Sequence, residues 1–182
     1  MANATKKATG TSSNWVTGTF RDRENAERAY NTLGSRGYSK DDVNLLMSDD
    51  TRKKHFSDDA DTGTGLGSKA LEGAGAGGAI GGTVGAILAA VAAVGTTLAI
   101  PGLGIVIAGP LAAALAGAGA GAATGGLIGA LVGAGMPEDR AKLYEQDIKN
   151  GGIVMGVNPR TPEDAEYFER EWKNNRGENV YR

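Results

Sequence analysis

The sequence predicts an α+β protein in which a small head domain is interrupted by a long helical hairpin. Three observations lead to this prediction. Strand-like and helix-like segments occur on both sides of a central stretch made mainly of Gly, Ala, Leu, Ile and Val. No charged residue lies between Glu72 and Glu138 in this stretch. Within it glycine recurs at every fourth position in two separate rows, a spacing that lets helices approach closely.

Composition limits the kind of protein. At 182 residues the chain holds one ordinary domain, or one domain with a large insertion. The formal net charge of −2 argues against a nucleic-acid partner. The absence of cysteine excludes disulfides, thiol catalysis and thiolate metal sites. Residues 1–13 are polar without an apolar core segment, so we expect a flexible tail and not a signal peptide.

The segment 14–48 predicts the first half of the head. Residues 14–20 alternate and are rich in strand-forming side chains, which indicates a strand. Asp22 can cap a helix that runs to about Arg36. The inner face of this helix carries apolar side chains at helical spacing, namely Ala26, Ala29, Tyr30 and Leu33. A second strand is expected at 43–47, and the charged, glycine-containing residues 49–68 are expected to form a solvated linker.

The segment 136–182 predicts the second half of the head. Pro137 suits a helix start, and Gly151 and Gly152 end that helix. A third strand is expected at 153–157, then a helix capped at Thr161, and a short edge strand at 179–181. Neither half can bury enough apolar surface alone. We therefore expect the strands of both halves to share one sheet in a ferredoxin-like split βαβ arrangement.

The central residues 69–135 predict two helices, the first over about 70–99 and the second from near Gly109. Glycine in a helix is unfavourable unless close backbone contact compensates, so we expect both rows to mediate helix packing and oligomerisation. The rows consist of Gly73, Gly77, Gly81, Gly85, Gly117, Gly121, Gly125, Gly129 and Gly133. Most members are placed symmetrically about Pro101, which with Gly102 and Gly104 predicts the turn of an antiparallel hairpin. The alternative is a coincidence of low-complexity sequence.

The sequence fits two different surroundings of this hairpin, a lipid bilayer or other protein chains. Its lack of charge and its length allow a membrane location, and basic residues at both ends would keep both termini cytoplasmic. However, no aromatic residue lies between Phe56 and Tyr144, so the chain lacks an interfacial aromatic belt there. The helices are covered either by lipid or by further copies of the same chain. Self-association is expected in both cases.

No catalytic, cofactor or metal site is predicted. The run from Gly73 to Gly78 matches G-x-G-x-x-G, but it follows no strand and no acidic residue appears before Glu138. His55 is the only histidine, and its charged surroundings favour a solvated residue. The adjacent aspartate pairs lack the spacing of a calcium loop. We therefore expect a protein that is not an enzyme.

The pattern resembles the bacterial heat-induced general stress protein domain family and its glycine-zipper, low-temperature-induced relatives. The resemblance covers residues 15–157. It rests on segments that share the family's pattern: Val16–Phe20, Gly37–Ser39, Ile100–Gly104, Gly109–Leu115, Met136–Asp139 and Gly151–Val154. The resemblance implies induction by stress and carries over no catalytic residue.

These observations predict a non-enzymatic stress-response protein that self-associates through the helical hairpin and is associated with the cytoplasmic membrane. Its expected partners are further copies of itself and a lipid bilayer, with no nucleic acid and no cofactor. One alternative is a soluble self-assembling structural protein that forms a ring, cage or filament. Another is a small-ligand sensor head that is coupled to the hairpin.

Overall fold

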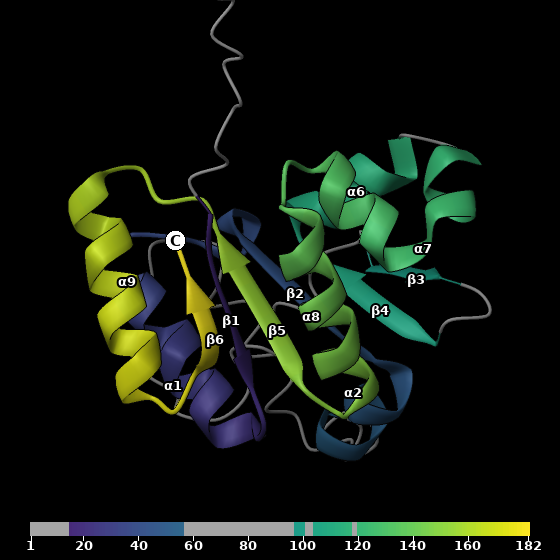
Figure 1. Cartoon of the computed structure of the whole chain (residues 1–182). Helices are drawn as coiled ribbons and strands as arrows, with labels where there is room; N and C mark the ends of the chain where they lie inside the picture. Colours follow the sequence, from purple (N-terminus) through teal and green to yellow (C-terminus); the bar gives the residue numbers. More distant parts are fainter. Residues whose placement is uncertain (1–14, 57–96, 101–103, 118–119) are drawn as a thin grey trace, which may run out of the picture.

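The computed structural model describes residues 15–56, 97–100, 104–117 and 120–182. It is a mixed α/β fold built on one antiparallel sheet, whose strand order is β3-β4-β2-β5-β1-β6 (Figure 1). The strands are β1 (Val16–Phe20), β2 (Val43–Ser48), β3 (Thr97–Ile100), β4 (Ile105–Ala108), β5 (Ile153–Val157) and β6 (Glu178–Tyr181). The α-helices are α1 (Arg23–Gly34), α2 (Asp49–Phe56), α6 (Pro110–Gly117), α7 (Ala120–Gly133), α8 (Glu138–Lys149) and α9 (Pro162–Asn174), and a 3-10 turn spans Lys40–Asp42.

The two halves of the chain interleave in the sheet. β5 lies between β1 and β2, with Val157 opposite Val16 on one side and opposite Val43 on the other. β1 in turn lies between β5 and β6. The prediction that strands from both sides of the central stretch share one sheet is therefore confirmed. Since every neighbouring pair is antiparallel, β1 runs parallel to β2, and β5 runs parallel to β6.

Helices α1 and α9 cover one face of the sheet (Figure 1). Both begin with the predicted caps, because the side chains of Asp22 and Thr161 accept the amides of Asn25 and Asp164. The large side chains of Phe20, Phe168 and Trp172 are fully buried in this core. Ala26, Ala29 and Leu33 of α1 are buried as predicted, whereas Tyr30 is only half-buried.

Helices α6, α7 and α8 cover the opposite face of the sheet. Their core contains Leu115, Leu131, Tyr144 and Ile148, packed against Ile107 of β4. The start of α6 is fixed by β2, since the amide of Leu111 donates to Oδ1 of the buried Asn44 at 2.6 Å. This second layer is built in part from the stretch that carries no charge.

The structure corrects the prediction for residues 97–108. Thr97–Ile100 and Ile105–Ala108 are the paired strands β3 and β4, so the expected helix over 70–99 does not reach its predicted end. The turn between them joins two strands and not two helices, and Gly104 within it has a positive φ of 58°. A continuous apolar run fits a buried strand as well as a buried helix, so periodicity could not distinguish the two here.

Two further elements differ from the prediction. Within the expected linker 49–68, residues Asp49–Phe56 form α2, which buries Phe56 and Thr51. The predicted second helix does begin at Pro110, but it is divided into α6 and α7. α7 is itself kinked at Gly126, whose φ of 58° and ψ of −158° are not helical. The prediction of a single helix after Gly109 was therefore wrong.

The remaining parts of the predicted hairpin lie outside the described residues. These parts include the first glycine row, made of Gly73, Gly77, Gly81 and Gly85, together with Pro101 and Gly102. The symmetrical placement of the two rows about Pro101 therefore stays a prediction. None of the helices within the described residues is both long and apolar enough to cross a membrane.

Candidate functional site

The inner face of α6 and α7 is set by the spacing of their large apolar residues. On α6, Leu111 and Leu115 are buried against the sheet. On α7, Leu127 and Leu131 are buried in the same core. These pairs are four residues apart and lie on one side of each helix. The opposite side of each helix is consequently turned away from the sheet.

The outward face of α7 consists of Gly125, Gly129, Val132 and Gly133, all of which are exposed. A Cβ atom built on any of the three glycines would meet no heavy atom of the described residues within 4 Å. Val132 is 41% exposed, one of two large hydrophobic residues so exposed in the described part of the chain. The described part of the second glycine row thus forms an open ridge of minimal side chains, which we call the outward α7 face.

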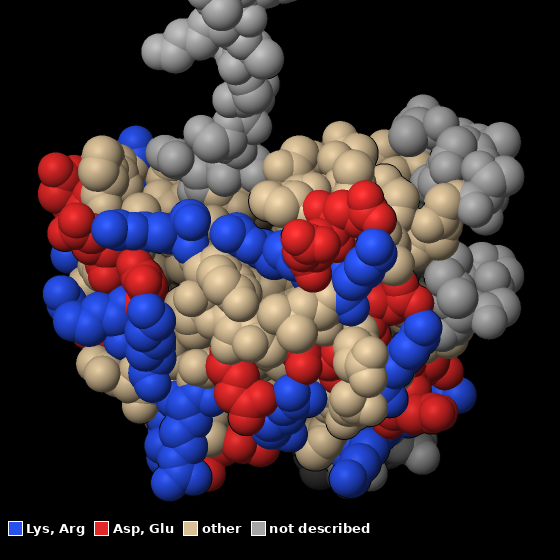
Figure 2. Space-filling model, in the orientation of Figure 1, with Lys and Arg blue, Asp and Glu red and all other residues tan. Residues whose placement is uncertain are grey.

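Neither α6 nor α7 contains a charged residue. Figure 2 shows tan surface in this region beside the blue and red atoms of charged residues. Ala113 and Ala114 are the exposed residues on the outer side of α6. Soluble surfaces normally intersperse both signs of charge, and an uncharged apolar patch marks an interaction site.

The other members of the predicted packing set are placed as follows. Gly117 is the last residue of α6 and Gly121 lies in the first turns of α7. Gly104 is exposed, and its carbonyl accepts the amide of Asp49 at 2.6 Å, which ties the β3–β4 turn to α2. The structure leaves Gly125, Gly129 and Gly133 all exposed, with Gly129 and Gly133 on one face of the helix after the kink at Gly126, and it places Gly104 in a different role.

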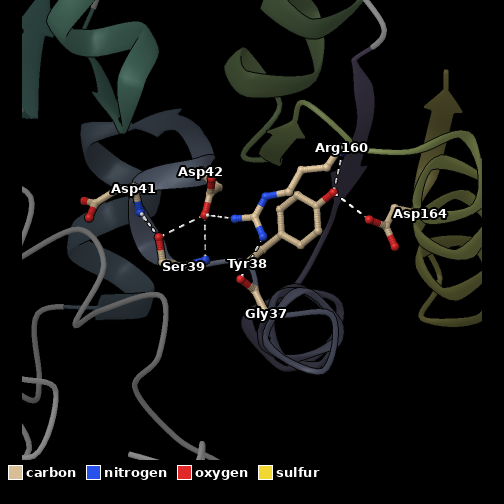
Figure 3. A network of polar contacts seen from close by, with 7 residues as sticks. All are labelled: Gly37, Tyr38, Ser39, Asp41, Asp42, Arg160 and Asp164. Carbon is tan, nitrogen blue, oxygen red and sulfur yellow. Dashed lines mark hydrogen bonds and ion pairs between the residues drawn. The ribbon is translucent and has the colours of Figure 1, made fainter. Parts of the chain in front are cut away.

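A network of polar contacts joins the two halves of the chain at one end of the sheet (Figure 3). The Tyr38 hydroxyl donates to Asp164 Oδ2 at 2.8 Å and accepts the Arg160 amide at 2.5 Å. The Arg160 guanidinium lies over the Tyr38 ring at 4.2 Å and donates to Asp42 Oδ2 at 3.1 Å. Ser39 closes a capping box with Asp42. We call this set the Tyr38 network.

The contacts of the Tyr38 network shift the pKa values of Tyr38 and Asp42. Burial raises the pKa of Tyr38, and the hydrogen bond to Asp164 raises it further against the opposing effect of the Arg160 amide. Partial burial acts to raise the pKa of Asp42, but the hydrogen bonds from Ser39 and Arg160 outweigh it, so its pKa lies below the ordinary value of 3.8. Asp42 and Asp164 both accept hydrogen bonds from arginine or tyrosine side chains of this network, so both carboxylates take part in contacts within the chain.

A second polar cluster fixes α8 to the edge of the sheet. The carboxylate of Asp147, whose residue is 4% exposed, accepts from three side chains. Thr19 Oγ1 and Arg21 Nη2 each lie 2.7 Å from it, and Asn179 Nδ2 lies at 2.8 Å. The Tyr144 hydroxyl on the same helix lies 2.7 Å from Thr17 Oγ1, and burial raises its pKa above the ordinary value of 10.0. We call this set the Asp147 cluster.

Neither polar set resembles a catalytic arrangement. His55 lies on α2, away from both, and burial together with Lys54 and Arg23 lowers its pKa. Within the ranges that the structure describes, no three His, Asp or Glu side chains are grouped to hold a metal ion. The hydrogen bonds to Asp147 tie α8 to β1, to β6 and to Arg21 in the turn between β1 and α1. Both sets therefore serve the connection between the two halves of the head.

Sequence reasoning missed two contributors to the outward surface, namely Val132 and the alanines of α6. A signal for them was present. Once Leu127 and Leu131 are assigned to the core, helical geometry places Gly125, Gly129 and Val132 on the other side. The expectation of a continuous helical hairpin concealed this, because it assigned every apolar side chain to helix–helix packing.

Comparison of the chain with protein-family models, with curated proteins and with solved structures gives no match.

Proposed function

We propose that this chain is a non-enzymatic stress-response protein that self-associates through the outward α7 face. The observation that carries the proposal is the open glycine ridge of Gly125, Gly129 and Gly133 on an uncharged helix pair.

The stress role rests on the resemblance of residues 15–157 to the heat-induced general stress protein domain family. It predicts that the amount of the protein in its host rises after a temperature shift, which quantitative immunoblotting measures. An unchanged amount under heat and cold would contradict this part.

The physical reason concerns helix stability. Each glycine inside a helix costs roughly 0.5–1 kcal/mol relative to alanine. Among the described residues, no side chain or backbone atom packs on this ridge, so no contact there compensates the cost of its glycines. Contact with another helix supplies such compensation, because glycine lets two backbones approach and gain dispersion contacts along the ridge. A second copy of the same ridge is the simplest such partner.

The substitution Gly129→Leu tests the proposal sharply. The Cβ atom of the new side chain would meet no heavy atom of the described residues within 4 Å, so the dilute chain should keep or raise its melting temperature. In the assembly the same side chain separates the two ridges, so light scattering after size exclusion should report smaller particles. The matched control is Gln146→Leu, which adds the same side chain at an exposed position of α8. The control should leave the particle size unchanged.

Two results would contradict the proposal. One is an unchanged particle size for Gly129→Leu. The other is a lower melting temperature of the dilute chain without any change in particle size, because that pattern means that the ridge is covered within one chain.

For the head, we propose a ferredoxin-like split βαβ fold. The strand order β2-β5-β1-β6, with α1 and α9 on one face, supports it. β3 and β4 would then be an extension of that sheet supplied by the central stretch. An experimental structure with a different strand order would contradict the assignment.

A membrane location is the second candidate, and the lack of charge between Glu72 and Glu138 favours it. Cell fractionation tests it with the full chain. Recovery in the membrane fraction after a high-salt wash, with release by detergent, would support lipid contact. Recovery of all the protein without detergent would favour a soluble assembly of packed copies instead.

A further inference from the structure

The two edges of the six-stranded sheet differ in how they end. At the β6 edge, the register shifts between Thr17 and Thr19, and Asn179 has a positive φ of 50°. Glu178 of β6 also pairs with Arg21 at 2.8 Å. Register shifts and charged side chains are the features that prevent a sheet edge from pairing with another strand. The β6 edge is protected in this way.

The β3 edge carries none of these features. Its sequence, Thr97–Ile100, contains no charge and no proline, and it pairs with β4 in unbroken register from Thr97 opposite Ala108 to Ile100 opposite Ile105. Within the described ranges, no strand pairs with its other side. A strand in this position presents a row of N–H and C=O groups that fit the edge of another strand.

We propose that β3 pairs in antiparallel register with β3 of a second copy of this chain. A two-fold axis perpendicular to the sheet brings two identical edges together, and the edge is self-complementary because an antiparallel strand pair has the same symmetry. No like charges meet at this contact, since β3 is uncharged. The contact goes beyond the proposed glycine contact and does not depend on it.

The geometry of the sheet sets the form of this pairing. α6 lies against β3 and β4 on one face of the sheet. A two-fold axis perpendicular to the sheet keeps that face on the same side in both copies, so the two α6 helices lie on one face of a continuous sheet. Only 4 residues of each copy take part, so the pairing is reversible and depends on concentration.

A pair of proline substitutions tests the pairing. Successive residues of a strand direct their N–H groups to opposite edges, so of Leu98→Pro and Ala99→Pro one removes a β3–β4 hydrogen bond and the other removes only a donor of the free edge. The variant that loses a β3–β4 hydrogen bond should have a lowered melting temperature. The other variant keeps the melting temperature of the dilute chain, and sedimentation equilibrium should show that its dimer population is lost. A variant with full stability and full dimer population would overturn the inference.

The variant Gly129→Leu separates this contact from the glycine contact. If the stable proline variant lowers the dimer population while Gly129→Leu does not, the β3 pairing holds and the glycine proposal fails. If only Gly129→Leu changes the assembly, the β3 pairing fails and the glycine proposal holds. If the stable proline variant and Gly129→Leu each abolish a different association step, both the β3 pairing and the glycine contact hold.

If both proline variants unfold, hydrogen exchange of the unmodified chain tests the β3 pairing instead. The amides of β3 that face the free edge should exchange more slowly as the protein concentration rises. The amides of β6 should exchange at a constant rate. Exchange of the β3 amides that does not change with concentration would overturn the inference, because the edge is then either free or covered within one chain.

Discussion

Gly109 shows how closely the backbone of the central stretch approaches the head. It connects β4 to α6 with a φ of 103°, and a Cβ atom there would lie 2.1 Å from the carbonyl oxygen of Val43. A side chain at this position is thus opposed both by the backbone conformation and by the neighbouring strand. The glycine lets α6 turn directly above β2, where Asn44 accepts the amide of Leu111.

Replacement of this glycine gives the first prediction. Gly109→Ala should lower the free energy of unfolding by about 3 kcal/mol, since conformational strain and a steric clash add. The matched control is Gly37→Ala, which has a positive φ of 73° but no heavy atom of the described residues within 4 Å of its Cβ position. The control should cost only about 1 kcal/mol. Urea denaturation measures both values, and equal losses would contradict the close approach at Gly109.

Asp42 gives a prediction about acid stability. Its folded pKa lies below the ordinary value of 3.8, so its contribution is complete above that pH and is lost as the pH falls through the lower folded value. The unfolding free energy of the unmodified chain should therefore fall more steeply from about pH 5 to about pH 2 than that of Asp42→Asn. Circular dichroism over a pH series in urea measures both slopes. Parallel curves would show that the contacts with Ser39 and Arg160 do not form.

At the scale of elements, α7 combines a kink with a regular helix. Gly126 has a φ of 58° and a ψ of −158°, a conformation almost restricted to glycine. Gly129 lies in the helical part, and no heavy atom of the described residues lies within 4 Å of its Cβ position. The kink separates Gly125 from the turn that carries Leu127 and Leu131. Gly126 therefore sets the bend of α7, whereas Gly129 belongs to its exposed face.

The third prediction compares these two glycines. Gly126→Ala should destabilise the dilute chain by about 2 kcal/mol, because alanine cannot adopt the kinked conformation without strain. Gly129→Ala should stabilise it by about 0.7 kcal/mol, the usual gain in an exposed helix position. Thermal unfolding of both variants at low concentration measures this. A gain in stability for Gly126→Ala would show that α7 is a straight helix.

The elements of the head could be predicted because their signals are local. The caps at Asp22 and Thr161, and the strand-forming residues of β1 and β5, gave the correct element type with boundaries close to those observed. Prediction failed at β3 and β4, where Ile105–Ala108 and its neighbours are apolar throughout. Such a run is buried whether it is helical or extended, and only the free edge of β2 determines that it extends the sheet.

The candidate site could be predicted in part. The spacing of Gly125, Gly129 and Gly133 indicated one face; all three are exposed, but the kink at Gly126 interrupts the helix after Gly125. The direction in which this face points depends on Leu127 and Leu131 contacting the sheet and α8, which are distant in sequence. The Tyr38 network could not be predicted either, because the contacts of Tyr38 and Asp42 with Arg160 join residues 118 or more positions apart.

At the scale of the whole molecule, the head and the outward surface have separate tasks. The Tyr38 network and the Asp147 cluster connect the two halves of the chain through buried, fully paired carboxylates. The central stretch adds two strands to the sheet and a helical layer above it. In this account the head is a rigid base that presents an uncharged glycine ridge and a free strand edge to further copies.

The fourth prediction concerns the assembly itself, and sedimentation equilibrium of the full chain in detergent-free buffer tests it most directly. The weight-average mass should rise with concentration above that of a single chain. Gly129→Leu should bring it back toward the mass of one chain at the same concentration, while Gln146→Leu should not. A mass equal to that of one chain at every concentration would contradict self-association.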